Sequence, residues 1–229
     1  MFDPLTATRF KKDVLREALE KESALELIRL PEETAGRLNA DPSFIVREDR
    51  DQFDYVYRTG DLAELPGQAF DAKRNFVRRF RDQFSFEFLP LTKDHIRDCL
   101  YFEEEWCQAK DCQSTDSLGK ERQAVREMLE HLGALGVTGA MIRIAGKIEA
   151  VTLGEALNPR TFVIHIEKAN GVFIGIYQAI NQMFSQQVKS MGFDFINREQ
   201  DLGVPGLRKA KESYHPVLLV KKYSAILRQ

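Results

Sequence analysis

The chain has 229 residues, enough for one large domain or two small ones with a buried core. Charged residues make up 30% of it and hydrophobic residues 43%, the ordinary balance of a soluble globular protein. The net charge is −2, so contact with nucleic acid or anionic lipid must depend on a local basic surface. No charged-then-apolar leader opens the chain and no apolar run approaches membrane-spanning length, so we expect a cytoplasmic protein.

The three cysteines are odd in number and lack the close spacing of a zinc site. We expect Cys99, Cys107 and Cys112 to be free thiols in a reducing compartment. His95 shares a helix face with Cys99, but two such side chains without further ligands do not make a metal site. We therefore expect no metal.

Helices and strands alternate in the first part of the chain. Residues 8–22 have the apolar periodicity of an amphipathic helix. A short helix is predicted to begin at Pro31, because Glu32 and Glu33 fall in its first turn, where the helix dipole favours acidic side chains. The strands predicted in this part span 24–30, 44–47 and 53–57.

A strongly basic amphipathic helix is predicted over residues 70–84. Its apolar face carries Phe76, Val77, Phe80 and Phe84, and its cations are Lys73, Arg74, Arg78 and Arg81. Such a charge run is most often the solvated face of a connecting helix. The functional alternative is a surface that binds the phosphates of RNA or of lipid headgroups.

The second part of the chain has a distinctive order of elements: strand, helix, helix, three strands, helix, strand, helix, strand. The predicted ranges are 87–91, 93–109, 121–132, 138–144, 147–155, 161–168, 174–191, 193–196, 207–213 and 216–223. This order is that of the acyltransferase fold called GNAT, and the first part resembles the back end of the same fold. We therefore expect an α/β protein in which a complete GNAT-like module, residues 86–229, packs on a partial one, residues 1–85, that includes the basic helix.

Four sequence runs carry a more specific resemblance: FDYVYRTGDLAELPGQAFDAKRN, ALNPRTFVIHIEKAN, YQAINQMF and FINREQDLGVPGLRKAKESYHP. They resemble the phosphatidylglycerol lysyltransferase C-terminal-domain family, a bacterial group built from two tandem GNAT-like modules. The resemblance covers about residues 50–223, and the last run is the most specific. Characterised relatives transfer an aminoacyl group from charged tRNA to a membrane lipid, and related peptide-bridge enzymes transfer it to cell-wall precursors.

For this chain the resemblance implies an aminoacyl- or acyltransferase that acts on an amine or a hydroxyl. The expected partners are aminoacyl-tRNA as donor and a lipid headgroup, small amine or peptide as acceptor. The strands equivalent to 161–168 and 193–196 diverge in the GNAT fold, and their carboxyl ends line the site. We therefore expect the polar side chains that end these strands to meet there.

Each candidate side chain has an expected role in acyl transfer, which requires a base, a positioned carbonyl and cations for the oxyanion. Glu199 is the expected base or amine-holding group, Asn197 would fix the carbonyl, and Lys209 would hold phosphate or the oxyanion. The expected substrate-binding residues are Glu167, Lys168, Arg198, Asp201, Arg208, Tyr214, Gln178 and Asn181.

Structural alternatives accompany these roles. Glu199 and Arg198 would form ordinary surface ion pairs with Lys209 or Arg208. Tyr214 would belong to the core. His165 alternates with apolar neighbours in its predicted strand, which is typical of a satisfied interior histidine.

The turn before the long helix separates two enzyme classes. Acetyl-CoA-dependent GNAT enzymes usually hold pyrophosphate on backbone amides of a glycine-rich turn. Here KANGVFIGIYQAINQ places Tyr177 where a small residue is wanted, so CoA is disfavoured and we expect no cofactor. An acetyl-CoA-dependent N-acyltransferase and a catalytically silent GNAT-fold binding module stay open as alternatives.

Overall fold

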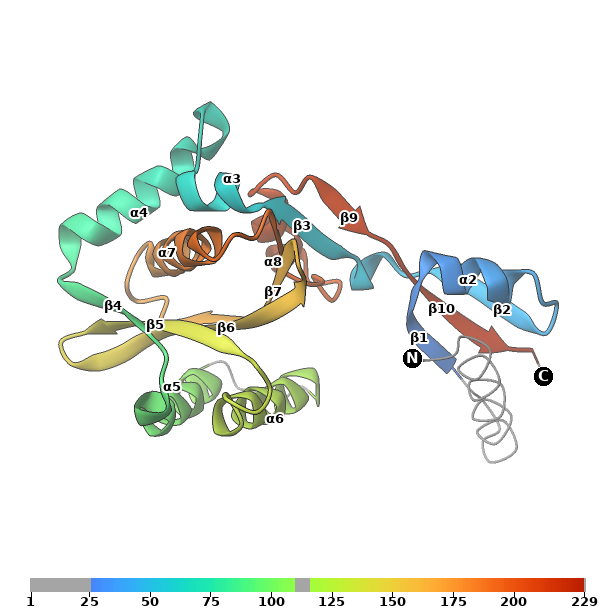
Figure 1. Ribbon diagram of the computed structural model, residues 1–229, viewed down its shortest axis with the longest axis horizontal. Helices are drawn as coiled ribbons and strands as arrows, with labels where there is room; N and C mark the ends of the chain where they lie inside the picture. The colour runs from blue at the N-terminus through green and yellow to red at the C-terminus, as the bar shows by residue number, and fades with distance from the viewer. Residues whose placement is uncertain (1–25, 110–115, 229) are drawn as a thin grey trace. The chain divides into compact units, whose positions relative to one another are not determined.

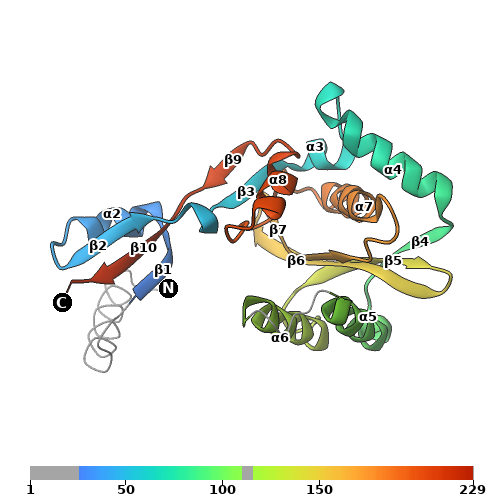
Figure 2. The same ribbon diagram turned by 180° about the vertical axis from the view of Figure 1, so that it is seen from behind.

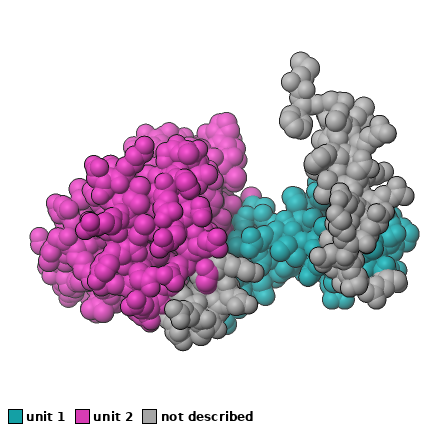
Figure 3. Space-filling view, turned by 90° about the horizontal axis from the view of Figure 1, so that it is seen from below, with its two compact units in different colours: residues 1–54, 200–208, 219–229 teal, residues 55–199, 209–218 magenta. Residues whose placement is uncertain are grey.

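The computed structural model describes residues 26–109 and 116–228 (Figures 1 and 2), so the helix predicted over 8–22 and Cys112 lie outside the described residues. Two compact units interleave along the chain. The smaller takes residues 1–54, 200–208 and 219–229, and the larger takes 55–199 and 209–218 (Figure 3). The division into GNAT-like modules, residues 1–85 and 86–229, stays a prediction.

The smaller unit is built on a three-stranded antiparallel sheet in the order β1-β10-β2. Its elements are β1 (Glu26–Pro31), α2 (Glu32–Asn39), β2 (Phe44–Glu48) and β10 (Lys222–Leu227). Ala225, at the centre, pairs with Leu27 on one side and Val46 on the other, and it is fully buried. Helix α2 packs on this sheet and buries Ala35.

A seven-stranded mixed sheet has the order β4-β5-β6-β7-β8-β3-β9. The strands are β3 (Asp54–Arg58), β4 (Phe86–Pro90), β5 (Thr138–Ile144), β6 (Lys147–Asn158), β7 (Thr161–Ala169), β8 (Phe195–Asn197) and β9 (Leu218–Val220). The helices are α3 (Thr59–Glu64), α4 (Asp71–Gln83), α5 (Ile96–Ala109), α6 (Asp116–Glu130), α7 (Ile176–Ser190) and α8 (Pro205–Glu212). Strands β4 to β7 are antiparallel and β7–β8 is a parallel pair. This arrangement confirms the expected α/β, GNAT-like fold.

Helices cover both faces of the large sheet (Figures 1 and 2). Successive strand residues point to opposite faces, and each face therefore has its own core. On β6, Val151 and Leu153 pack against α5 and α6, whereas Ala150 packs against α7. The same alternation on β7 decides which of its polar residues can meet.

The C-terminal strand differs from its prediction. One strand was expected over 216–223, but the chain forms β9 in the large sheet and then β10, which extends to Leu227 in the small sheet. Alternation of apolar and polar residues reports extended backbone but not the sheet that a strand joins. None of the helices within residues 26–109 and 116–228 is both long and apolar enough to span a membrane.

The cysteine prediction is partly wrong. Cys99, on the buried face of α5, is a free thiol, and burial, aided by the charge of Asp98, raises its pKa to about 12. Cys107 is disulfide-bonded rather than a free thiol. An odd number of cysteines in a sequence does not report which thiols meet in space.

Gly175, at the start of α7, lies against α4. Its φ is 92°, and an added Cβ would lie 2.3 Å from the carbonyl oxygen of Phe76. We expect Gly175→Ala to lower the free energy of unfolding by about 2–4 kcal/mol, from the left-handed backbone and the overpacking together. Gly171→Ala is the matched control, because no atom lies within 4 Å of its added Cβ. Urea denaturation measures both, and equal losses would contradict this packing.

Candidate functional site

The parallel strands β7 and β8 separate soon after they pair. Their register joins Thr161 to Phe195 and ends with Val163 opposite Asn197, where β8 stops, whereas β7 continues to Ala169. Beyond that point the two segments meet through side chains rather than through backbone hydrogen bonds. The predicted divergence of these strands is thus present, and its side chains form the candidate site.

An ion pair bridges this gap. Arg198 Nη2 lies 2.8 Å from Glu167 Oε1, and Asn181 Nδ2 of α7 donates to Glu167 Oε2 at 2.8 Å. The Arg198 guanidinium also lies near the rings of Tyr57 and Tyr214, 5.8 and 5.1 Å from their centroids. Burial is the largest single influence and opposes the charge of Arg198, but Glu167, Tyr57 and Tyr214 together outweigh it and the pKa of Arg198 is raised. The arginine therefore stays charged although it is largely buried.

Two polar atoms of this group are buried without a hydrogen-bond partner among the described residues: Nη1 of Arg198 and Oδ1 of Asn181. Nη1 belongs to the guanidinium that lies between two aromatic rings, whose faces attract cations. Contacts with Asn181 and with the rings of Tyr57 and Tyr214 thus fix the Arg198–Glu167 ion pair in place.

His165 links two carboxylates next to this ion pair. Its Nδ1 lies 3.0 Å from Glu199 Oε1 and its Nε2 lies 3.1 Å from Glu155 Oε1. The hydrogen bond to Glu199 raises the pKa of His165, and burial opposes this shift only in part. The side chains of Glu199 and Glu155 are 36% and 41% exposed, so both carboxylates that flank His165 are in contact with solvent.

Glu199 has a left-handed backbone, with φ of 54°. Its N–H donates to Asn197 Oδ1 at 2.7 Å, and its carbonyl oxygen accepts from the N–H of Tyr55 at 3.2 Å and from Lys211 Nζ at 3.0 Å. A left-handed non-glycine residue costs about 1–2 kcal/mol and is often found at functional sites. The neighbouring strand and helix thus hold the predicted base in one position.

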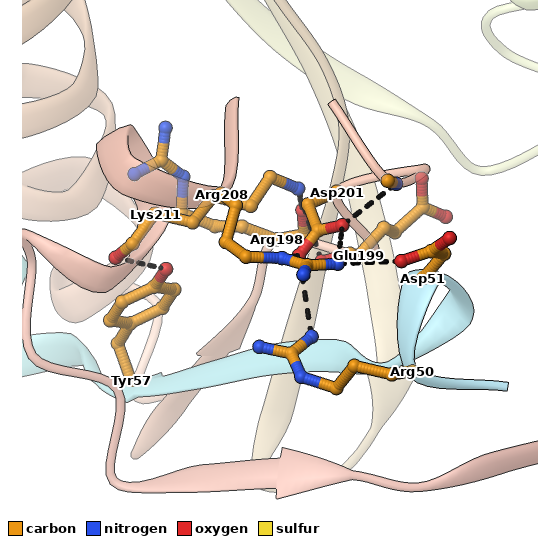
Figure 4. A network of polar contacts seen from close by, with 9 residues as sticks. Arg50, Asp51, Tyr57, Arg198, Glu199, Asp201, Arg208 and Lys211 are labelled. Atoms are coloured by element: carbon orange, nitrogen blue, oxygen red, sulfur yellow. Dashed lines mark hydrogen bonds and ion pairs between the residues drawn. The ribbon is translucent and has the colours of Figure 1, made fainter. Parts of the chain in front are cut away.

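Lys211 is the buried cation of helix α8. Its Nζ also donates to the carbonyl oxygen of Arg198, and its own carbonyl oxygen accepts from the hydroxyl of Tyr57 at 2.9 Å (Figure 4). Lys209, the predicted cation, is exposed, and its side chain makes no hydrogen bond or ion pair within the described part of the chain. Helix α8 therefore supports Glu199 through Lys211.

Asp201 and Arg208 bind each other, within the smaller unit. Arg208 donates from Nε to Asp201 Oδ2 at 2.8 Å and from Nη2 to Asp201 Oδ1 at 2.9 Å (Figure 4). Arg208 Nη2 also donates to Asp51 Oδ1 at 2.6 Å, and Arg50 Nη1 lies 3.3 Å from Asp201 Oδ2. The hydrogen bonds that Arg208 donates to Asp201 and Asp51 raise the pKa of Arg208. This bidentate pair fixes the Gly-Val-Pro-Gly turn to α8, which is a structural role.

Lys168 points to the opposite face of the sheet from Glu167, because the two are consecutive in β7. Its Nζ lies 2.7 Å from Glu103 Oε1, 2.9 Å from Glu121 Oε1 and 4.2 Å from the centroid of the Trp106 ring. Burial raises the pKa of Glu103 although Lys168 opposes the shift. The structure therefore does not bring Lys168 to the other predicted site residues.

Two more predicted residues flank the ion pair. Tyr214 is buried between two cations, since Lys73 Nζ lies 4.2 Å from its ring centroid and Arg198 lies near the same ring. Burial raises the pKa of Tyr214. Gln178 is half-buried on α7, and its side chain makes no hydrogen bond within the described residues.

The cations of α4 have different surroundings. Lys73 Nζ donates to Ser213 Oγ at 2.6 Å, and burial, with the charge of Arg198, lowers the pKa of Lys73. Arg74 donates to the carbonyl oxygens of Leu65 and Gly67 and pairs with Asp71. Arg78 and Arg81 are exposed. Arg78 also donates to Asn75 Oδ1 at 3.1 Å. Contact of these four cations with phosphate stays a prediction.

A cavity of about 220 Å³ lies elsewhere, at the start of α5 beside the β5–β6 hairpin. It contains none of the predicted site residues. Its cations are already paired, Arg143 Nε with Glu87 at 2.8 Å and Lys147 Nζ with Glu105 at 2.8 Å. The diverging strands therefore remain the candidate site.

Sequence reasoning missed three contributors: His165, Glu155 and Lys211. The signal for His165 was present, because alternation along its strand places it on the same face as Glu167. Glu155 lies near the end of β6, and no local pattern indicates that it faces His165. Lys211 cannot be distinguished by sequence from Arg208 and Lys209 on the same short helix.

Comparison with known proteins matches the chain to one family model and to several solved structures. A family model described as phosphatidylglycerol lysyltransferase, C-terminal, matches residues 1–226. A conserved protein of unknown function from Bacteroides thetaiotaomicron VPI-5482 is 38% identical, with a TM-score of 0.87, over 96% of this chain and 75% of that chain. None of the curated proteins compared matches the chain.

Two more distant structures have the same fold. The C-terminal domain of a putative lysylphosphatidylglycerol synthetase from Agrobacterium fabrum is 12% identical, with a TM-score of 0.69, over 93% of this chain and 70% of that chain. L-PGS from Bacillus licheniformis is 16% identical, with a TM-score of 0.66, over 93% of this chain and 71% of that chain. At these identities the likeness concerns the fold alone.

Proposed function

The chain belongs to the phosphatidylglycerol lysyltransferase C-terminal family, and from that premise we propose that it is an aminoacyl- or acyltransferase acting on an amine or a hydroxyl. The family match confirms the resemblance that the sequence predicts. We further propose aminoacyl-tRNA as the donor and a lipid headgroup, small amine or peptide as the acceptor. A location in the bacterial cytoplasm is part of the same proposal.

The observation that carries this proposal is the partly exposed Glu199 carboxylate, held beside His165 where β7 and β8 diverge. The acceptor amine or hydroxyl would attack the ester carbonyl of the donor and lose its proton to Glu199. The tetrahedral oxyanion would then collapse and release the tRNA oxygen, which takes the proton from Glu199 to become a hydroxyl. Asn197 supports the base through the backbone of Glu199, and the exposed Lys209 is our candidate for the oxyanion.

The test uses the full chain and a donor of defined chemistry. Bulk tRNA charged with radiolabelled amino acids is incubated with the protein and one of three acceptors: phosphatidylglycerol vesicles, a short peptide or an alkyl diamine. We expect label in one acceptor fraction above the rate without protein. Absence of transfer to all three would contradict the proposal and favour the catalytically silent binding module.

The surroundings of α7 support a reaction without CoA. Gly175 lacks a side chain where α7 touches the backbone of α4, so its conformation serves helix packing. The hydroxyl of Tyr177 lies 3.4 Å from Trp106 Nε1, and its ring is half-buried at the start of the same helix. Tight CoA binding in calorimetry would overturn this part of the proposal in favour of an acetyl-CoA-dependent N-acyltransferase.

If α4 binds tRNA, its exposed arginines should account for most of the salt dependence of the affinity for tRNA. We expect Arg78→Ala combined with Arg81→Ala to lower the slope of log affinity against log salt by about 2, because each arginine removed leaves one phosphate without its cation. Fluorescence anisotropy with labelled tRNA, between about 50 and about 300 mM salt, measures the slope. The matched control removes two exposed cations elsewhere, Arg126 and Lys189. Equal slopes in the two double variants would rule out α4 as the tRNA surface.

A further inference from the structure

His165 has an arrangement that a core histidine does not need. Both ring nitrogens face carboxylates, Glu199 at 3.0 Å and Glu155 at 3.1 Å, and these come from different elements. A carboxylate only accepts hydrogen bonds when ionised, so both bonds are made when the ring carries two protons. An interior histidine satisfied by neutral partners would need only one.

The two carboxylates are separated by the imidazole ring. Each approaches a different nitrogen, so they cannot bind one metal ion together with that ring. Within residues 26–109 and 116–228, no three histidine, cysteine, aspartate or glutamate side chains converge as ligands of a metal. A chain of hydrogen bonds is what this geometry provides.

The other charged groups near His165 do not interrupt the hydrogen bonds that link Glu199, His165 and Glu155. Glu167 lies on the same face of β7, but it is bound to Arg198 at 2.8 Å and to Asn181 of α7 at 2.8 Å. From the other elements against the ring come Glu155 of β6 and Glu199 after β8. These two carboxylates are therefore the groups that exchange protons with the ring.

We infer that Glu199, His165 and Glu155 form a proton relay that passes a proton to solvent as Glu199 takes one from the acceptor. The inference rests on the proposed function, because the acceptor supplies the proton. As Glu199 takes that proton, the imidazolium keeps its Nδ1 proton and gives its Nε2 proton to Glu155, which is 41% exposed and releases it to water. When Glu199 gives its proton to the leaving tRNA oxygen, the ring regains a proton on Nε2 from water through Glu155, and every group returns to its starting state.

The relay is first tested without any substrate. Histidine ring resonances of the full chain are followed by NMR as a function of pH. The pKa of His165 is expected above the usual value of 6.5 and is expected to fall in both Glu155→Gln and Glu199→Gln. An unchanged His165 titration in either variant would overturn the relay, whatever the activity of the protein.

The second test asks whether the relay serves transfer. With radiolabelled bulk aminoacyl-tRNA and the acceptor used by the unmodified protein, Glu155→Gln and His165→Ala should lower kcat by about 10²-fold and leave KM unchanged. Added imidazole should restore part of the kcat of His165→Ala, because it replaces the missing ring, which a purely structural role would not allow. Glu130→Gln, an exposed carboxylate-to-amide change on α6, is the matched control.

The outcomes separate the relay from the proposed function. Wild-type kcat in His165→Ala, or a loss that imidazole does not relieve, overturns the relay and leaves the transferase proposal standing. No transfer by the unmodified protein overturns both, and the NMR coupling would then describe an ion cluster alone.

Discussion

Glu199→Gln is expected to lower the kcat of aminoacyl transfer by about 10²–10⁴-fold, the usual contribution of a general base. Glutamine keeps the shape of the side chain and can still hydrogen-bond to His165, but it cannot accept the proton of the acceptor. The left-handed backbone of Glu199 is held by Asn197, Tyr55 and Lys211, and it does not depend on the carboxylate. The folded structure should therefore persist.

The division of the effect between kcat and KM identifies the role of the carboxylate. A base acts in the transition state, so its loss lowers kcat and kcat/KM together, whereas loss of a group that holds the donor ammonium raises KM. Glu130→Gln and thermal unfolding provide the controls for charge and for folding. A Glu199→Gln protein with wild-type kcat and KM would remove Glu199 from the site.

Lys168→Met is expected to lower the free energy of unfolding by about 3–5 kcal/mol, because it leaves the buried carboxylate of Glu103 without its cation. Lys168 pairs with Glu103, which is only 4% exposed, and with Glu121. Methionine keeps the volume and the contact with Trp106, so the loss measures charge rather than packing. Urea denaturation measures it, and Lys189→Met, at an exposed ion pair with Glu64, is the matched control.

The loss of unfolding free energy in Lys168→Met should depend on pH in a defined direction. Burial already raises the pKa of Glu103 above its usual 4.5, so the folded state binds more protons than the unfolded state above that pH. Stability from this group is greatest at low pH and falls as the pH rises through the raised pKa. Removing Lys168 strengthens this effect, so the deficit of the variant should be smaller near about pH 5 than near about pH 7.

A second substitution checks the cause. Lys168→Met combined with Glu103→Leu replaces a buried ion pair by apolar groups and should recover about half of the loss or more. A deficit that is independent of pH and not recovered in the double variant would assign the effect to packing.

The fold was predictable because two kinds of periodicity are strong in this sequence. Alternation along β6 and β7 and the helical stripes of α5 and α7 give the order of elements, and that order is specific enough to identify the GNAT-like arrangement. The destination of the last strand was not predictable. The choice between two sheets depends on partners distant in sequence, and no local pattern at Lys222 reports them.

The candidate site was predictable in part for the same reason. The diverging ends of β7 and β8 do bring together Glu167, Arg198 and Glu199. Placing Lys168 with Glu167 ignored the alternation that separates neighbours in a strand. Asp201 and Arg208 were assigned to substrate, but they satisfy each other, because a buried carboxylate needs a bound cation.

The order β1-β10-β2 has a consequence for biosynthesis. Strands β1 and β2 emerge from the ribosome early, yet both are hydrogen-bonded to β10, about 170 or more residues later in the chain. Neither has its backbone partner until that late strand arrives. This small sheet is therefore completed only after the large sheet and its helices have been translated. Until then the backbone groups of β1 and β2 are unpaired and open to pairing with strands of other chains.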